Sequence, residues 1–251
     1  MRSALVRPPG PRLAEGIVTF FERRPIDLEL ARRQHAAYTD ALSQAGFAVH
    51  EVEPADDCPD AVFVEDTAVV FGGHAPVAIL ARPGAPARRD EIAGTERALR
   101  SLGVEIREME GEFTLDGGDI LQVGDTLYVG RSGRTDDEAL CRISPAIPTR
   151  RVVGVKVTGC LHLKSAMTAL PDGTLIGVPD RLDTSGLPGM LVAPEPAGAH
   201  LVVLDAEHVL IAASAPRTAD LLRRDGWRVT AVDISEFEAL EGCVTCLSII
   251  I

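Results

Sequence analysis

Residues 119–135, DILQVGDTLYVGRSGRT, contain a structural unit that recurs along this chain. Two short apolar runs flank the dipeptide Gly124-Asp125, and Gly-Asp between runs rich in β-forming residues is a strong signal for a β-hairpin. After the second run the chain enters a loop of small residues that contains an arginine. The segment therefore predicts two antiparallel strands followed by a polar loop.

Three other segments have the same order of strand, tight turn, strand and arginine-containing loop. Their turns are predicted at Gly72-Gly73, at Asp172-Gly173 and near Asp205. A repeated supersecondary unit indicates an architecture built from similar modules. The three segments are residues 66–85 (DTAVVFGGHAPVAILARPGA), 163–181 (LKSAMTALPDGTLIGVPDR) and 200–218 (HLVVLDAEHVLIAASAPRT).

Helices are predicted between the hairpins, at residues 28–45, 91–102 and 216–224, where apolar residues recur at helical spacing. Gly46 is expected to stop the first of them. Each helix is followed by a glycine and a short strand, in the sequences GFAVHEV, GVEIREM and GWRVTAV. The module is thus a hairpin, a helix and a strand, roughly 35–50 residues in all.

Two regions fit this module less well. Residues 138–156, EALCRISPAIPTRRVVGVK, give a partial helix signal ahead of two prolines and are short for a helix plus a strand. Residues 182–190, LDTSGLPGM, are predicted to form a mobile loop around Gly186.

A fifth hairpin forms if the last residues, VTCLSIII (244–251), pair with ALVRPPG (4–10) near the start, which would close the modules into a ring. The alternative is an open α/β sheet with hairpin insertions. Both are α/β folds. The chain has no Pro/Gly-rich linker and no break in composition, so we expect a single domain over residues 1–251.

Charge and cysteine content limit the classes of partner and the compartment that we expect for this protein. The 251 residues carry 25 Lys+Arg against 37 Asp+Glu, a net charge of −12, which argues against nucleic-acid or anionic-membrane partners because both bind basic patches. No apolar run is long enough for a membrane span, and the N-terminal residues lack the apolar core of a signal peptide. Five cysteines, an odd and small number, fit free thiols in a reducing compartment. We therefore expect a cytoplasmic protein whose ligand is a small cation or a neutral molecule.

Candidate reactive groups fall at strand ends and hairpin entries, from which a ring of modules would direct them to a central channel. Glu65 and Asp66 interrupt an apolar run, and burying two adjacent carboxylates costs several kcal/mol unless a cation neutralises them. The glycines of residues 116–119, Asp-Gly-Gly-Asp, permit close backbone approach to a ligand. Each group alone also fits a structural role, as a solvated acidic loop, an Asx turn or a core residue. Together with His162 and the C-terminal cysteines they make a nucleophile, a base and a cation site.

Three chemistries are compatible with the cysteines. Cys160, His162, Cys243 and Cys246 could supply the ligands of a zinc site, and C-x-x-C pairs also occur in redox proteins, where they usually begin a helix. VTCLSIII is predicted as a strand instead, and neither G-x-S-x-G nor a P-loop occurs. The third chemistry is attack of a cysteine on a cationic carbon. For that chemistry we expect neither a metal ion nor a cofactor.

Five segments together resemble the dimethylarginine dimethylaminohydrolases, members of the guanidine-modifying superfamily that also includes arginine deiminases and amidinotransferases. The resemblance implies a five-bladed α/β propeller, or pentein, in agreement with the repeat pattern. It also implies hydrolysis of Nω-methylated arginine to citrulline and dimethylamine or methylamine; arginine deimination, or hydrolysis of another substituted guanidine, is the alternative on the same fold. The segments are PDAVFVEDTAVV, TLDGGDIL, YVGRSGRT, LHLKSA and EGCVTCLS.

The same resemblance implies the catalytic roles. Cys246 is the nucleophile that forms a covalent thiouronium intermediate with the guanidinium carbon. His162 protonates the departing amine and then activates water, and Asp116 holds His162 or the guanidinium. Glu65 and Asp66 face the guanidinium, as paired carboxylates do when they accept its N–H groups.

The remaining implied contacts are at the amino-acid end of the substrate. Asp60 matches the carboxylate nearest the α-amino group. Arg82 and Arg134, in LARPGA and SGRTDD, look like the pair that binds the α-carboxylate. Ile17 and Leu240 align with positions that line the substrate through backbone or apolar contacts. The partner is then a small cationic amino acid, and a homodimer is left open because the outer faces of hairpins can pair.

The acids around Cys246 have a consequence for its ionisation. They disfavour a thiolate in the empty site, whereas a cation within ~4 Å at an effective dielectric constant near 20 is worth about 4 kcal/mol, or roughly three pKa units. We therefore expect substrate binding to ionise Cys246. The resemblance gives Cys243, beside the nucleophile, no role.

Overall fold

Residues 2–73 and 75–251 are described by a computed structural model, in which they form short strands and α-helices joined by 3-10 turns. The helices are α1 (Leu28–Gln44), α2 (Glu91–Ser101), α3 (Asp137–Ala146), α4 (Pro216–Arg224) and α5 (Ser235–Glu238). The strands are β1 (Ser3–Val6), β2 (Ala48–Glu51), β3 (Ala68–Phe71), β4 (Val77–Leu80), β5 (Glu105–Arg107), β6 (Ile120–Val123), β7 (Thr126–Arg131), β8 (Arg151–Lys156), β9 (Met167–Ala169), β10 (Leu175–Gly177), β11 (Met190–Val192), β12 (Leu201–Asp205), β13 (His208–Ala212), β14 (Arg228–Val232) and β15 (Ile249–Ile250).

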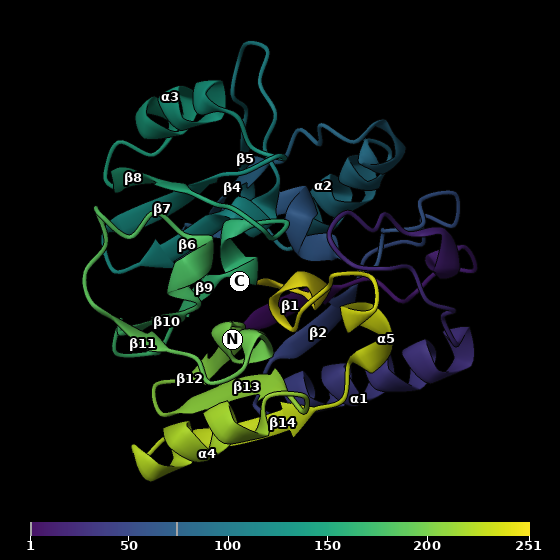
Figure 1. Ribbon diagram of the computed structural model, residues 1–251. Helices are drawn as coiled ribbons and strands as arrows, with labels where there is room; N and C mark the ends of the chain where they lie inside the picture. The colour runs from purple at the N-terminus through teal and green to yellow at the C-terminus, as the bar shows by residue number, and fades with distance from the viewer. Residues whose placement is uncertain (1, 74) are drawn as a thin grey trace.

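The strands form five three-stranded sheets that follow one another around a common centre (Figure 1). In each sheet the first pair of strands is antiparallel and the second pair is parallel, as a hairpin followed by a crossover requires. The predicted hairpin turns at Gly124-Asp125, Asp172-Gly173 and Asp205 are confirmed. The turn predicted at Gly72-Gly73 joins β3 to β4, and it includes position 74, which lies outside the described residues.

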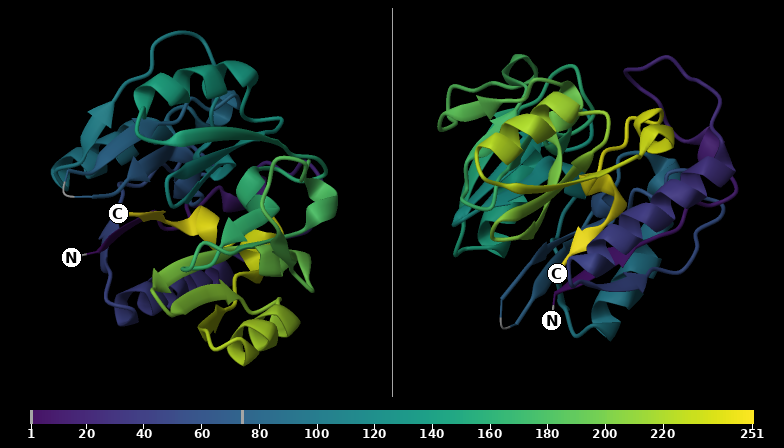
Figure 2. Two further views of the ribbon diagram at one scale, coloured as in Figure 1. Left: turned by 90° about the vertical axis from the view of Figure 1, so that its left-hand side faces the viewer. Right: turned by 90° about the horizontal axis from the view of Figure 1, so that it is seen from below.

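The two ends of the chain close the ring. β15 pairs antiparallel with β1, with Ala4 opposite Ile250 and Leu5 opposite Ile249, and β2 pairs with β1 on its other side. The N- and C-termini consequently lie side by side in both views of Figure 2. The predicted fifth hairpin is confirmed, and the alternative of an open sheet is wrong.

The longer helices α1 to α4 lie on the outside of the ring (Figure 1). The helices predicted at residues 28–45, 91–102 and 216–224 are confirmed as α1, α2 and α4. All three end at a glycine in the left-handed region, where only glycine is unstrained. These glycines are Gly46 (φ 86°), Gly103 (φ 76°) and Gly226 (φ 95°). None of the described helices is long and apolar enough to cross a membrane.

The expectation that residues 138–156 are too short for a helix and a strand is wrong. They contain most of α3 and all of β8, which pairs parallel with β7. Pro145 lies next to the last residue of α3, so the helix is already ending where the missing N–H would be needed. Residues 182–189 form the predicted loop before β11; its mobility stays a prediction.

The C-terminal segment that carries two cysteines is held in the core between α1 and the central channel. Cys243, Cys246 and Leu247 are buried in one apolar cluster with Tyr38 and Phe237. Tyr38 Oη and Ser248 Oγ are hydrogen-bonded at 2.7 Å. A segment packed this densely presents its side chains in one defined arrangement.

Candidate active site

A small cavity lies where the ring modules meet. Its lining comes from the loop after β1, the segment before β3, the loop after β7 and the C-terminal segment. The structure therefore brings together six of the ten residues predicted for the site. They are Ile17, Asp60, Asp66, Arg134, Leu240 and Cys246.

His162 lies between two carboxylates beside this cavity. Its Nε2 is 3.0 Å from Asp116 Oδ2, and its Nδ1 is 3.7 Å from Asp66 Oδ1. Burial alone would lower the pKa of His162, but Asp66, Asp116 and the nearby Asp119 outweigh it and raise the pKa to about 9. Burial likewise disfavours the charged form of Asp66, but His162 and Arg88 outweigh it and lower the pKa of that carboxyl. The imidazole is thus an imidazolium at neutral pH.

Two glycines allow this arrangement. A Cβ on Gly117 would lie 2.1 Å from the carbonyl oxygen of Glu65, and one on Gly118 would lie 2.6 Å from Asp66 Oδ1 and 2.7 Å from His162 Nδ1. Gly118 N also donates to Asp66 Oδ1 at 3.0 Å. The expectation that these glycines permit close approach to a ligand is therefore corrected, because what they approach is the protein's own acidic segment and histidine.

Asp119 is a buried residue of this centre that the sequence did not single out for a role. Its Oδ1 accepts the backbone N–H of Leu163 at 2.8 Å, and its Oδ2 accepts the hydroxyl of Ser132 at 2.6 Å. Burial raises the pKa of Asp119 to about 6, although His162 and Ser132 oppose this rise. Because Leu163 follows His162 directly, Asp119 fixes the backbone on which the imidazole is carried.

Glu65 is paired with a lysine. Lys164 Nζ lies 2.6 Å from Glu65 Oε1, whereas Glu65 Oε2 is buried without a hydrogen-bond partner. Burial raises the pKa of Glu65 to about 7 despite Lys164. Glu65 and Lys164 line a second, wider cavity between the inner strands, and Glu65 is not part of the lining of the smaller one. The orphaned Oε2 nevertheless leaves one carboxylate oxygen able to accept a further N–H.

Asp60 and the two apolar positions, Ile17 and Leu240, line the same cavity. The backbone N–H of Ile17 donates to both oxygens of Asp60, at 3.0 and 3.2 Å. Burial raises the pKa of Asp60, and Arg88 and this hydrogen bond oppose the rise. Leu240 lines the same cavity beside Glu241, whose Oε1 accepts the backbone N–H of Thr19, among others. The loop that carries Ile17 is thus tied to the segment that carries Leu240.

Arg82 is not part of the cavity, and the arginine that lines it with Arg134 is Arg88. The side chain of Arg82 is exposed, stacks over Phe113 with its guanidinium carbon 4.6 Å from the ring centroid, and donates to the carbonyl of Gly111. The prediction that Arg82 and Arg134 form a pair is therefore corrected. Arg82 forms an isolated antiparallel bridge with Leu115, and its side chain lies on the exposed side of that bridge.

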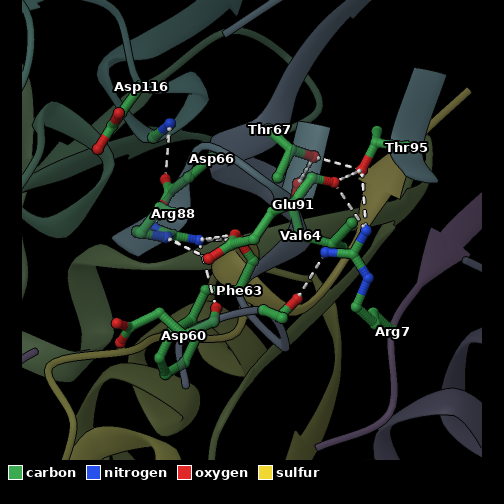
Figure 3. Close-up of polar contacts among 12 residues, drawn as sticks. Arg7, Asp60, Phe63, Val64, Asp66, Thr67, Arg88, Glu91, Thr95 and Asp116 are labelled. Atoms are coloured by element: carbon green, nitrogen blue, oxygen red, sulfur yellow. Dashed lines mark hydrogen bonds and ion pairs between the residues drawn. The ribbon is translucent and has the colours of Figure 1, made fainter. Parts of the chain in front are cut away.

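Arg88 is instead fully buried between Asp66 and Glu91 (Figure 3). Its Nη1 is 2.5 Å from Asp66 Oδ2, and its Nε and Nη2 bind both oxygens of Glu91 at 3.0 and 2.8 Å. Burial alone would lower the pKa of Arg88, but Glu91 and Asp66 raise it well above its usual value. The sequence signal was Arg88-x-x-Glu91 directly after Pro86, a turn that brings both side chains to one face. Arg134 Nη1 lies 3.8 Å from Asp116 Oδ2.

The two C-terminal cysteines are in contact. The Sγ atoms of Cys243 and Cys246 are 3.2 Å apart, and both residues are buried. The hydrogen bond between the two sulfur atoms raises the pKa of Cys246, as do burial and the carboxylates of Glu65 and Asp66. The same hydrogen bond lowers the pKa of Cys243. The contact therefore favours the thiol form at Cys246 and the thiolate form at Cys243.

The proposed zinc ligands do not gather. Cys160 Sγ contacts the backbone oxygen of His162 at 3.5 Å rather than its ring. In the described part of the chain, the group of potential ligand atoms that lie within 4.8 Å of one another is Asp66, Asp116 and His162. Because Cys160, Cys243 and Cys246 are not part of that group, the geometry does not support the zinc alternative.

Comparison with known proteins agrees with this geometry. No protein-family model matches the chain. It is 52% identical over 251 residues to an N(G),N(G)-dimethylarginine dimethylaminohydrolase of Streptomyces coelicolor, covering 99% of this chain and 96% of that protein. It superposes on the dimethylarginine dimethylaminohydrolase of Pseudomonas aeruginosa in complex with citrulline with a TM-score of 0.88 at 28% identity, covering 99% and 98% of the two chains.

A third similarity concerns the fold alone. The N-terminal domain of a cyanobacterial arginine dihydrolase has a TM-score of 0.89 at 19% identity, covering 99% of this chain and 97% of that domain. The five-bladed α/β propeller predicted from the repeats is therefore the architecture of this chain. The identity shared over nearly its whole length with the Streptomyces enzyme goes further: the chain belongs to the dimethylarginine dimethylaminohydrolase family.

Proposed function

We propose that this protein hydrolyses Nω-methylated arginine, both the asymmetric dimethyl and the monomethyl form, to citrulline and dimethylamine or methylamine. The observation that carries the proposal is the position of Cys246 on the same small cavity as Asp66, with the imidazolium of His162 beside them. A thiol, an acid and a proton donor around one enclosed space are what displacement of an amine from a guanidinium requires.

The cavity suits a molecule that is cationic at one end and zwitterionic at the other. The guanidinium is placed against Asp66 and the orphaned oxygen of Glu65, which accept its N–H groups. Arg134 and Arg88 are assigned to the α-carboxylate, and Asp60 to the α-amino group. With Arg88 in place of Arg82, the cavity is still lined by two arginines.

The chemistry then proceeds in two halves. The thiolate of Cys246 attacks the guanidinium carbon, and His162 gives its proton to the nitrogen of the departing amine, leaving a thiouronium bonded to sulfur. His162, now neutral, takes a proton from water as that water attacks the same carbon. The hydroxyl of the resulting tetrahedral intermediate loses its proton as the carbon–sulfur bond breaks, and the sulfur takes up that proton, so that citrulline is released and Cys246 returns to its thiol form. Asp116 keeps the imidazole oriented and stabilises its protonated form through both halves.

Cys246 is proposed to ionise only when the cation is bound. Its pKa in the empty site is raised by Cys243, burial, Glu65 and Asp66, so the thiol form prevails until a positive charge arrives. A titration of the thiol by ultraviolet absorbance, with and without a non-reactive guanidinium ligand, tests this. A lower thiol pKa in the presence of the ligand is expected, and an unchanged pKa would contradict the proposal.

The alternative on this fold is removal of the unmethylated amine of arginine. Phe63 and Leu161 line the same cavity as Cys246, and apolar side chains around the departing amine fit its methyl groups better than an unmethylated guanidinium nitrogen. This wall favours the methylated substrate over arginine. If arginine proves to be the better substrate, Phe63 and Leu161 are the residues to substitute in order to test this wall.

The decisive experiment is incubation of purified protein with asymmetric dimethylarginine and, in parallel, with arginine, with citrulline as the readout. Cys246→Ser serves as the blank, and Cys141→Ser, at an exposed cysteine on α3, is the matched control that should keep its activity. Citrulline from the methylated substrate, lost only in the Cys246 variant, is expected. Citrulline mainly from arginine would keep the mechanism and replace the substrate, whereas citrulline from neither would overturn the proposed function.

A further inference from the structure

Cys243 has no part in the proposed hydrolysis, although it is buried beside the thiol of Cys246. The backbone N–H of Cys246 donates to the carbonyl of Cys243 at 3.0 Å, which closes a turn and puts both side chains on the same side of it. The two sulfur atoms are 3.2 Å apart, and Thr245 Oγ1 lies 3.2 Å from the sulfur of Cys243. The backbone hydrogen bond, the contact between the sulfur atoms and the contact with Thr245 together fix the positions of the two thiols.

We propose that Cys243 and Cys246 are a peroxide-oxidisable dithiol, in which oxidation at Cys246 is resolved by Cys243 into a reversible disulfide that removes the nucleophile. A disulfide needs an S–S distance of about 2.05 Å, so the sulfur atoms must approach by about 1.2 Å. Rotation of the two side chains about χ1 covers such a shift, since the turn already fixes their backbones close together.

The cavity determines which sulfur meets the oxidant. Cys246 lines the space in which the substrate is proposed to react, and a peroxide is smaller than that substrate. Cys243 is 2% exposed and is not part of the lining. A small hydroperoxide therefore reaches Cys246 first. Cys243 is then the thiol that attacks the oxidised sulfur of Cys246.

The reaction balances without any further reactant. The sulfur of Cys246 attacks one oxygen of hydrogen peroxide, the O–O bond breaks, and a sulfenic acid and one water are formed. The sulfur of Cys243 then attacks that of Cys246, the S–O bond breaks, and a second water leaves with the thiol proton. Two thiols are oxidised by two electrons and the peroxide is reduced, and a dithiol reductant reverses the outcome by thiol–disulfide exchange.

The other cysteines do not offer this chemistry. In the described residues, the contact between two sulfur atoms is that of Cys243 with Cys246, whereas Cys160 Sγ contacts the backbone oxygen of His162. The hydrogen bond with Cys246 also lowers the pKa of Cys243, which favours the thiolate at the resolving sulfur. Disulfide formation within the chain is thus expected to be confined to the C-terminal pair.

Without a resolving thiol, a sulfenic acid on Cys246 would be oxidised further to a sulfinic acid, which thiols do not reverse. The pair consequently protects the nucleophile while it inactivates the enzyme. The loss of activity rests on the proposed function, because it assumes that Cys246 is the nucleophile, but formation of the disulfide does not. The two can therefore be measured separately.

The sequence makes the test simple, because trypsin cleavage after Arg228 leaves both thiols on one peptide, residues 229–251, with no other cysteine. The reduced protein is treated with hydrogen peroxide, blocked with iodoacetamide and digested. The expected peptide is unalkylated and lighter by two hydrogen atoms, and dithiothreitol restores both thiols and the activity. A Cys246 sulfinic acid beside an alkylated Cys243, or a link from Cys246 to Cys160, would overturn the proposal.

Two variants sharpen the result. Cys243→Ser keeps a hydroxyl next to Cys246 and is expected to carry Cys246 to the sulfinic acid, with inactivation that dithiothreitol does not reverse. Cys160→Ser, the matched control, is expected to form the same disulfide as the unaltered protein. If Cys243→Ser does not fold, the peptide map of the unaltered chain still shows whether peroxide forms the Cys243–Cys246 disulfide. If the reduced protein releases no citrulline, that map continues to test the dithiol while the proposed function fails.

Discussion

The guanidinium of Arg88 lies 2.5 Å from the carboxylate of Asp66, and both side chains are only 4% exposed. Glu91 binds the other edge of the same guanidinium. One buried cation therefore holds two buried carboxylates, and one of these carboxylates faces the proposed reaction centre. This arrangement connects the stability of the ring to the electrostatics of the site.

Arg88 and Arg82 make a matched pair of substitutions. Arg88→Ala leaves Asp66 and Glu91 buried without their counter-charge, and removing one partner of a buried ion pair costs about 3–5 kcal/mol. Arg82→Ala removes an exposed stacking contact with Phe113 and is expected to cost about 1 kcal/mol or less. Urea denaturation of the two variants measures the difference. Similar losses in both would contradict the assignment of Arg88 to the centre of the site.

The same pair is expected to separate in kinetics. Arg82→Ala should leave KM for the amino-acid substrate close to that of the unaltered protein, because Arg82 does not line the cavity. Arg88→Lys keeps a charge but loses the planar fork, so it should raise KM more than it lowers kcat. An increase in KM on substitution of Arg82 would instead support the predicted role of Arg82, with Arg134, in binding the α-carboxylate.

Much of the architecture could be predicted because its determinants are local. Hairpin turns at Gly124-Asp125 and Asp205, and the helix of residues 28–45 with Gly46 behind it, depend on neighbours a few residues apart. Once four modules are recognised, the unpaired ends of the chain are the remaining candidates for the fifth. The error at residues 138–156 came from treating Pro145 as a barrier, whereas it lies where α3 already ends.

The site was harder to predict where the choice depends on which way a side chain faces. Arg82 and Arg88 lie in one loop, and only the turn begun by Pro86 points the second inward at Glu91. Asp116 and Asp119 flank the same glycines and are equally buried, yet one binds an imidazole and the other binds the backbone of Leu163. Such differences arise from packing between modules that are distant in the sequence.

The pH dependence of kcat/KM is expected to be bell-shaped. Glu65, whose pKa is raised to about 7 by burial, must ionise to hold the guanidinium, so activity rises with pH through about 7. His162, whose pKa is raised to about 9 by its carboxylates, must keep its proton to release the amine, so activity falls through about 9. A Glu65→Gln variant should lose the acid limb and keep the alkaline one; an unchanged acid limb in that variant would remove Glu65 from the assignment.

His162 also makes stability depend on pH. Its pKa rises from an ordinary value of 6.5 in the unfolded chain to about 9 in the folded one, so the folded state binds the extra proton between these limits. The stabilisation is fully present below pH 6.5 and is lost as the pH rises through about 9. At 1.36 kcal/mol per pKa unit this amounts to about 3 kcal/mol. Denaturation at both ends of the window should show a steeper decline for the unaltered protein than for His162→Gln, and parallel declines would refute the protonated state of the histidine.

Asp119 is predicted to be a positioning residue for His162. Its Oδ1 holds the backbone N–H of Leu163 and its charge contributes to the raised pKa of the imidazole. Asp119→Asn keeps an acceptor oxygen for that N–H but removes the charge, so the alkaline limb of the pH profile should move to lower pH while KM changes little. Asp119→Ala removes both, and should also lower kcat, because the backbone that carries the imidazole loses its anchor. A purely structural role would reduce the amount of folded protein without moving the alkaline limb, and comparing Asn with Ala on equal amounts of folded protein separates the two.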